Sequence, residues 1–280
     1  MAANCFDEYF ARIGFTGRPT ATLDTLRELQ RLHTTAIAFE NLDPLVGRPV
    51  SLDLAALHDK LVSRRRGGYC YEQNFFFQNV LQNIGFSVRG LAAVSQWKRP
   101  TSEFGPRIHM VLEVTIGDGR FLVDVGFGRL TLTTPLRLEP HVEQPTTLET
   151  FRLAPRGDEL QVQIETRDAT GRAWEPVYQV SLQETSAADY AVYNWFTSTN
   201  PGVVFTTHLM AARPSQECRF GLFDNNLSIH HRDGRSERRA LRSTSELASV
   251  LQDVFGIVLP AGCEAALGRV ILMNSTPAVS

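Results

Sequence analysis

Apolar residues recur with a helical spacing over the first 85 residues of the chain. Thr22 and Ser51 each precede such a stripe and are suitable N-cap residues. The stretch from 71 to 84 is apolar on most sides and is followed by Gly85, which predicts a deeply buried helix. The other apolar stripes are Phe6, Phe10 and Ile13; Leu23, Leu26 and Leu29; and Leu54, Leu57 and Leu61. We therefore expect residues 1–85 to form a helical bundle.

After Phe86 the pattern of apolar residues changes to a period of two, which continues to about Leu182. Segments 107–116 and 120–125 flank Gly117-Asp118-Gly119, a strong signal for a hairpin. Several short strands separated by turns are typical of a small barrel or sandwich. Residues 86–185 therefore predict an antiparallel β-domain.

The last third of the chain mixes both periods. Residues 186–199 predict a linking helix, and Ser243 with Glu246 predicts a capped helix that ends at Gly256. Between them we expect short strands at 203–210, 218–223 and 227–231. The sequence as a whole predicts an α+β fold with the divisions 1–85, 86–185 and 186–280.

Composition excludes several classes of function. The 280 residues are 43% hydrophobic and 21% charged with a net charge of -2, so neither nucleic acid nor an anionic membrane is an expected partner. Cys5, Cys70, Cys218 and Cys263 are scattered without a Cys-x-x-Cys pair, so we expect neither a disulfide framework nor a zinc site. We see no signal peptide or apolar run that could span a bilayer, and expect a cytoplasmic protein.

Cys70 has the surroundings of a reactive cysteine. Gly67 and Gly68 precede it and suit a tight turn, because glycine adopts backbone angles closed to other residues. The cysteine would then lie in the first turn of the helix, where unpaired N–H groups and the helix dipole favour a thiolate. Most free cysteines are simply buried, but the turn, the helix start and the partners described next favour a catalytic role.

His109 is the best candidate for a partner, because it lies within a strand that is otherwise apolar. Its neighbours Ile108 and Met110 begin the apolar face, so His109 points to the other side. On the returning strand, Val123 and Val125 match the apolar face, which places Asp124 on the face of His109. A lone histidine is more often a hydrogen-bonded core residue, but a buried aspartate on the same face needs a partner.

The length of the hairpin loop decides whether His109 and Asp124 meet, because directly opposed residues point to the same side. A two-residue loop at Asp118-Gly119 puts Asp124 opposite Glu113, roughly 13 Å along the strand from His109. A four-residue loop puts Asp124 opposite Val111 and diagonal to His109, within reach. The hypothesis of a triad therefore requires a loop wider than the tightest one, or a bulge.

These segments together resemble one family, the arylamine N-acetyltransferases. The resemblance is carried by residues 38–42 (AFENL), 66–74 (RGGYCYEQN), 123–128 (VDVGFG) and the His109 strand, and it runs over nearly the whole chain. It implies a helical bundle, a β-barrel and an α/β lid around a transglutaminase-like or papain-like catalytic core. It also implies Cys70 as nucleophile, His109 as base and Asp124 as the group that orients the histidine.

The resemblance further implies acetyl-coenzyme A as donor, arylamines, arylhydrazines or arylhydroxylamines as acceptors, and no metal. By the same resemblance Phe39 faces the acceptor and the turn at Gly126 and Phe127 lines the substrate site. Tyr71 and Phe205 suit core packing and cleft lining equally well. Separately, Glu40 is expected to pair with Arg66 and hold the turn before the cysteine. The predicted substrate-binding residues are therefore Phe39, Tyr71, Gly126, Phe127 and Phe205.

Other interpretations of the same residues remain. The turn 126–128 lacks the third glycine of a dinucleotide fingerprint and follows an antiparallel hairpin, so we reject that interpretation. His230 and His231 are adjacent on a strand and point apart, which does not suit a metal site. A cysteine amidase or peptidase of transglutaminase-like architecture shares the triad order and stays open. A catalytically silent protein that binds coenzyme A or aromatic ligands is a further alternative.

Overall fold

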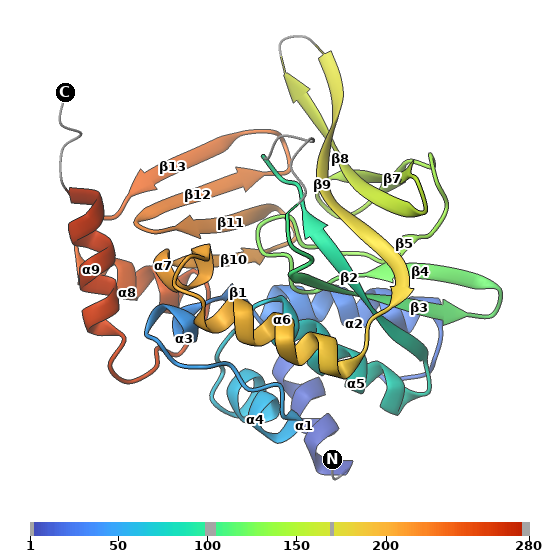
Figure 1. Cartoon of the computed structure of the whole chain (residues 1–280), viewed down its shortest axis with the longest axis horizontal. Coiled ribbons are helices and arrows are strands. Elements are labelled where there is room, and N and C mark those ends of the chain that lie inside the picture. Colours follow the sequence, from blue (N-terminus) through green and yellow to red (C-terminus); the bar gives the residue numbers. More distant parts are fainter. Residues whose placement is uncertain (1–2, 99–104, 169–170, 276–280) are drawn as a thin grey trace.

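The structure, a computed structural model of the chain, describes residues 3–98, 105–168 and 171–275. Figure 1 shows the strands of a barrel on one side, a second sheet on the other, and helices along the base of both. The helices are α1 (Ala3–Ile13), α2 (Leu23–Ala36), α3 (Leu42–Leu45), α4 (Leu54–His58), a π-helical turn η1 (Asp59–Ser63), α5 (Cys70–Ile84), α6 (Ala187–Thr199), α7 (Val204–Thr207), α8 (Thr244–Asp253) and α9 (Glu264–Ser275). Among the described residues, no helix combines the length and the apolar character needed to cross a bilayer.

The strands of the described residues form two antiparallel sheets. The larger has eight strands in the order β5-β4-β3-β2-β9-β8-β7-β6, and the smaller has five in the order β1-β10-β11-β12-β13. Their bounds are β1 (Phe39–Glu40), β2 (Ser87–Ser95), β3 (His109–Ile116), β4 (Gly119–Val123), β5 (Leu136–Arg137), β6 (Gln144–Pro145), β7 (Thr150–Arg156), β8 (Glu159–Asp168), β9 (Gly171–Glu184), β10 (Met210–Pro214), β11 (Cys218–Phe223), β12 (Asn226–His231) and β13 (Ser236–Ala240). The fold is α+β, as predicted, and the larger sheet curls into a nearly closed barrel (Figure 1).

The helical part matches the sequence pattern closely. Thr22 caps α2, and α5 begins at Cys70 and ends before Gly85, which has a φ of 106°. The cap of α4 is Asp53 rather than Ser51, because the Asp53 carboxylate accepts the N–H groups of the first turn. As expected, α5 is buried on most sides and packs within the apolar core that α1, α2 and the barrel strands share.

The smaller sheet corrects two sequence predictions. Its first strand, β1, comes from the region expected to be wholly helical, and pairs Phe39 with Ala212 of β10. The segment 203–210, predicted as a strand, instead contains helix α7, and β10 begins only at Met210. Helices α3, α8 and α9 share one apolar core with this sheet. The N-terminal region therefore reaches into the C-terminal sheet.

Candidate active site

The turn before Cys70 is fixed by close backbone contacts. Gly68 forms a parallel bridge with Phe39 of β1, and a Cβ added at Gly67 would lie 2.2 Å from the Ala38 carbonyl oxygen. Neither Gly67 nor Gly68 has a positive φ, so the reason given from the sequence is wrong. Both positions need glycine because the chain passes too close to its neighbours for a side chain.

Cys70 is the first residue of α5 and is only 2% exposed. Its sulfur lies 3.7 Å from the carbonyl oxygen of Ile108, at the edge of β3. A Cβ at Gly126 would lie 2.7 Å from the Cα of Cys70, so the chain after β4 passes directly against the cysteine. The helix, β3 and the turn after β4 thus converge on one sulfur atom.

The His109 Nε2 and Asp124 Oδ2 atoms are 2.8 Å apart, and both side chains are buried. The hairpin pairs Ile116 with Gly119 and Leu112 with Val123. One residue further along the same register, Asp124 lies opposite Val111, as predicted. The predicted loop width was wrong, however. The loop is the tight pair Gly117-Asp118, and the φ of 60° at Gly117 suits a type II′ turn. The loop begins one residue earlier than assumed, so no wide loop or bulge is needed.

Asn74 was quoted in the sequence motif without a role, and the structure gives it one. Its amide nitrogen donates to Asp124 Oδ1 at 3.0 Å and to the Met110 carbonyl at 2.8 Å. Its amide oxygen accepts the N–H of Val125 at 3.1 Å. A polar residue four positions after Cys70 lies on the same side of the helix, which was the available signal. Asn74 therefore connects the helix of the cysteine with β3 and with the segment that follows β4.

The pKa of His109 is the outcome of opposing effects. Burial lowers it, because the imidazolium loses its hydration, but the Asp124 carboxylate and a hydrogen bond with the Cys70 sulfur raise the pKa of His109 to about 10. The rings of Phe127 and Tyr178 also pack against the His109 imidazole in edge-to-face geometry, with centroids 5.0 and 5.2 Å away. The site thus favours a positively charged imidazole held between two groups that can carry negative charge.

Cys70 and His109 both line a cleft of about 670 Å³. Its walls come from the barrel, from the turn after β4, and from α7 and the smaller sheet. The predicted substrate residues Phe39, Gly126, Phe127 and Phe205 all line it. The lining also includes three cationic side chains, Lys98, Arg129 and Arg238. The cleft therefore offers aromatic and positively charged surface next to the sulfur.

Tyr71 is the predicted substrate residue that the structure does not bring to this cleft. It is fully buried, and its ring packs edge-on against those of Tyr69 and Tyr190, with interplanar angles of 77° and 60°. As the second residue of the helix it points into the helical core, away from the side on which Cys70 faces His109.

His230, His231, Cys218 and Cys263 do not line the cleft. His230 contacts Arg129 at 3.2 Å and Ser236 of β13 at 2.9 Å, and His231 contacts Glu237 of β13 at 2.8 Å, so the two imidazoles have different partners. No group of three metal-binding side chains occurs in the described part of the chain. Cys218 and Cys263 are free and buried.

The C-terminal wall of the cleft is tied to the N-terminal region by Asn41. Its amide nitrogen donates to the carbonyls of Phe205 and His208, and its amide oxygen accepts the Met210 N–H, each at 2.7 Å. Asn41 follows β1 directly, so one short segment carries both Phe39 and the support of α7. Phe39 and Phe205 are consequently held with ring centroids 6.4 Å apart.

A buried cysteine at a helix start, facing a histidine that binds a carboxylate, is the geometry of the cysteine–histidine–aspartate class of acyl-transfer enzymes. Comparison with known proteins narrows the class. A family model described as N-acetyltransferase matches residues 22–263. The arylamine N-acetyltransferase of Mycobacterium tuberculosis is 42% identical over 253 residues, which cover 89% of this chain and 88% of that protein. That of Escherichia coli is 35% identical over 252 residues, covering 90% and 88%.

Solved structures agree with this result. The structure of Mycobacterium marinum arylamine N-acetyltransferase in complex with CoA superposes with a TM-score of 0.89 and 44% identity, covering 95% of this chain and 99% of that one. The Salmonella typhimurium enzyme superposes with a TM-score of 0.89 and 32% identity, covering 98% and 100%. The chain belongs to the arylamine N-acetyltransferase family.

Proposed function

We propose that the protein transfers an acetyl group from acetyl-coenzyme A to arylamines through an acetyl-cysteine on Cys70, with ping-pong kinetics. The observation that carries this proposal is the contact chain from Cys70 through His109 to Asp124, which opens into a cleft of about 670 Å³. Family membership supplies the donor and the class of acceptor, because the relatives are named for arylamine acetylation and one of them holds CoA.

In the first half-reaction the Cys70 thiolate attacks the thioester carbonyl of the donor. A new S–C bond forms and the bond to the coenzyme A sulfur breaks. His109 gives its proton to that sulfur, so coenzyme A leaves as a thiol and the imidazole becomes neutral. The reaction exchanges one thioester for another, so it is nearly balanced in energy. The first-turn N–H groups of α5 have no partners within the helix and are candidate donors to the oxyanion.

In the second half-reaction the amine nitrogen attacks the acetyl-cysteine. His109, now neutral, accepts the proton that the nitrogen loses, and Cys70 leaves as a thiolate. Asp124 keeps the imidazole oriented and stabilises its positive charge in both steps, because it binds Nε2 and leaves Nδ1 toward the sulfur.

The cleft residues divide by chemistry. In this proposal Phe39, Phe127 and Phe205 contact the flat ring of the acceptor, and Gly126 provides backbone at the same turn. Lys98, Arg129 and Arg238 suit the phosphates of coenzyme A, because they are the cationic side chains of the lining. Tyr71 supports the helix from the core rather than touching substrate.

The proposal also concerns the domain organisation, further acceptors and the cellular location. Residues 1–85 carry the nucleophile, 86–185 carry the histidine and aspartate, and 186–280 act as a lid, so the catalytic core is transglutaminase-like or papain-like. Arylhydrazines and arylhydroxylamines are further acceptors, because each carries a nucleophilic nitrogen or oxygen next to an aromatic ring that the cleft can hold. The cytoplasm is the proposed location, since a nucleophilic cysteine stays reduced there.

The cysteine-hydrolase alternative differs only in the second nucleophile. An apolar aromatic cleft favours a flat amine over water at the acyl-enzyme, which supports transfer. The test is an initial-rate study with acetyl-coenzyme A and an arylamine, an arylhydrazine and an arylhydroxylamine, following release of the coenzyme A thiol.

The expected result is amine-dependent turnover with parallel double-reciprocal lines, lost in Cys70→Ala and kept in Cys218→Ala, a matched change at a buried cysteine outside the cleft. Coenzyme A release at the same rate without any amine would identify a hydrolase instead. Intersecting lines would contradict the acetyl-cysteine intermediate.

A further inference from the structure

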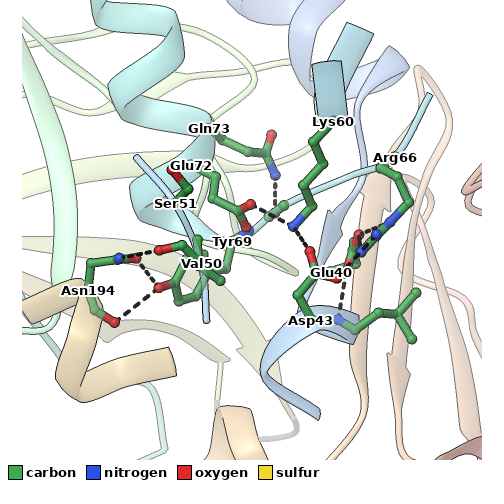
Figure 2. Close-up of polar contacts among 12 residues, drawn as sticks. Glu40, Asp43, Val50, Ser51, Lys60, Arg66, Tyr69, Glu72, Gln73 and Asn194 are labelled. Carbon is green, nitrogen blue, oxygen red and sulfur yellow. Dashed lines mark hydrogen bonds and ion pairs between the residues drawn. The ribbon is translucent and has the colours of Figure 1, made fainter. Parts of the chain in front are cut away.

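Five charged side chains lie together beside the turn that leads into α5 (Figure 2). We call them the Lys60 cluster: Glu40, Asp43, Lys60, Arg66 and Glu72. The Lys60 ammonium is 2.6 Å from Asp43 Oδ2 and 2.5 Å from Glu72 Oε1. Arg66 lies 2.7 Å from Glu40 and 3.3 Å from Asp43, so the expected pairing of Glu40 with Arg66 is present. None of the five lines the cleft.

The cluster holds three carboxylates but only two cations. Lys60 is the cation that contacts Glu72, whose side chain is 2% exposed. Burial lowers the pKa of Lys60, but the three carboxylates outweigh it and raise that pKa, so the ammonium stays charged at neutral pH. The pKa of Glu72 lies above its ordinary value, because burial and the Glu40 carboxylate raise it by more than Lys60 and the N–H of Tyr69 lower it. The ionisation of Glu72 therefore depends on Lys60.

Glu72 is the link between this cluster and the nucleophile. Its Oε2 atom accepts the N–H of Tyr69 at 3.0 Å, immediately before Cys70. A Cβ at Gly68 would lie 2.8 Å from the same oxygen, so the turn wraps closely around the carboxylate. The phenol of Tyr69 is held in turn by Asn194 of α6 (Figure 2). The position of the Glu72 carboxylate thus sets the backbone that presents the cysteine.

We propose that Lys60 is a positioning residue for acetyl transfer: it holds the Glu72 carboxylate ionised and in place, and Glu72 fixes the turn that presents the Cys70 sulfur to His109. The inference rests on the proposed function, since the step it controls is acetylation of that sulfur. Lys60 and Glu72 touch neither donor nor acceptor, so they act on the rate of acetylation and not on donor binding.

Loss of Lys60 would change the charge state of Glu72. In the described part of the chain, the titratable and charged groups that face the Glu72 carboxylate are Lys60 from η1, Glu40 from β1 and Tyr69 from the turn before α5. Without the ammonium, the remaining influences are burial and negative or neutral groups, so Glu72 binds a proton at higher pH. A neutral carboxyl group accepts the Tyr69 N–H less strongly than a carboxylate does.

The test is a double-mutant cycle made of Lys60→Met, Glu72→Gln and the combination of both. Lys60→Met keeps the length of the side chain without its charge. Glu72→Gln keeps an acceptor for the Tyr69 N–H without a titratable group. The matched control is Arg64→Met, which removes a cation from the same segment, but from an exposed pair with Asp59. Single-turnover acetylation of the full-length protein by acetyl-coenzyme A is measured between about pH 5 and 9.

The expected loss in K60M is about tenfold in the acetylation rate constant, with the half-saturating donor concentration unchanged within about twofold. The acid-side midpoint of its pH profile moves upward, because Glu72 is protonated at higher pH. The double variant is faster than K60M and has the wild-type midpoint, because no group at position 72 titrates. R64M behaves as wild type.

The inference is overturned if K60M matches R64M in rate constant and pH profile, if its profile is unshifted, or if the double variant is no faster than K60M. Thermal unfolding of each variant shows which of them fold. If K60M does not fold, the comparison of E72Q with the double variant decides. The inference then predicts that the double variant is acetylated at least as fast as E72Q. A double variant that is slower than E72Q overturns the inference. A wild-type protein that acetyl-coenzyme A cannot acetylate refutes the proposed function itself, which separates the two failures.

Discussion

Gly126 is the position where the smallest change should have the largest effect on the site. The Cβ of Gly126→Ala would lie 2.7 Å from the Cα of Cys70, 3.0 Å from Asn74 Nδ2 and 3.2 Å from the Cys70 carbonyl oxygen. Two carbon atoms in contact need about 3.8 Å, so the turn and the start of α5 must separate by about 1 Å. The atoms that this Cβ would meet belong to the Cys70 backbone and to the buried, hydrogen-bonded amide of Asn74, so they cannot move easily.

The magnitude follows from that displacement. Overpacking of this kind costs about 1–3 kcal/mol of folding stability. A shift of about 1 Å between a nucleophile and its partner costs about a hundredfold in rate. We therefore expect Gly126→Ala to fold with a lowered melting temperature and to be acetylated about a hundredfold more slowly by acetyl-coenzyme A.

The assay compares thermal unfolding and stopped-flow acetylation of Gly126→Ala with those of Gly202→Ala. Gly202 is exposed, has no positive φ, and a Cβ there meets only the Asn200 amide oxygen at 3.3 Å, so that control should behave as wild type. A Gly126→Ala protein with the wild-type melting temperature and acetylation rate would refute the packing of this turn against the cysteine.

Two other predictions concern Asn74, which supports the triad, and His109, which belongs to it. Asn74→Ala should lower the free energy of unfolding by about 3 kcal/mol, because the Met110 carbonyl and the Val125 N–H lose a buried partner; urea unfolding measures this, and a loss below about 1 kcal/mol would contradict it. The charge on His109 should stabilise the fold in a pH-dependent way. Because its pKa rises from about 6.5 unfolded to about 10 folded, this contribution is complete below about pH 6.5 and is lost as the pH rises toward 10. The stability difference between wild type and His109→Gln should therefore shrink over that interval, and a difference that stays constant or grows would count against the ion pair.

Local patterns were sufficient to predict much of the site. The run from Cys70 to Gly85 specifies the helix bounds, because cap chemistry and apolar burial act over a few residues. Parity along the two strands predicts that His109 and Asp124 share a face, because side chains alternate strictly in a strand. The start of the loop was mistaken, since Gly117-Asp118 and Asp118-Gly119 are both good turn pairs and only tertiary packing selects one.

Long-range contacts could not be predicted in the same way. Strand β1 has two residues and no periodicity, so nothing local indicates that Phe39 pairs with Ala212. The need for glycine at Gly67 comes from the Ala38 carbonyl across the turn, which sequence alone does not locate. Tyr71 suits core and cleft equally until the direction of the helix is known.

The central claim is that Cys70 carries the acetyl group between two half-reactions. Mass spectrometry of the protein mixed with acetyl-coenzyme A alone, followed by addition of an arylamine, tests it most directly. The account predicts one acetyl group on the peptide that contains Cys70, stable in water and discharged to the amide when the amine is added. No adduct, an adduct on a different cysteine, or an adduct that water removes as fast as the amine does would contradict it.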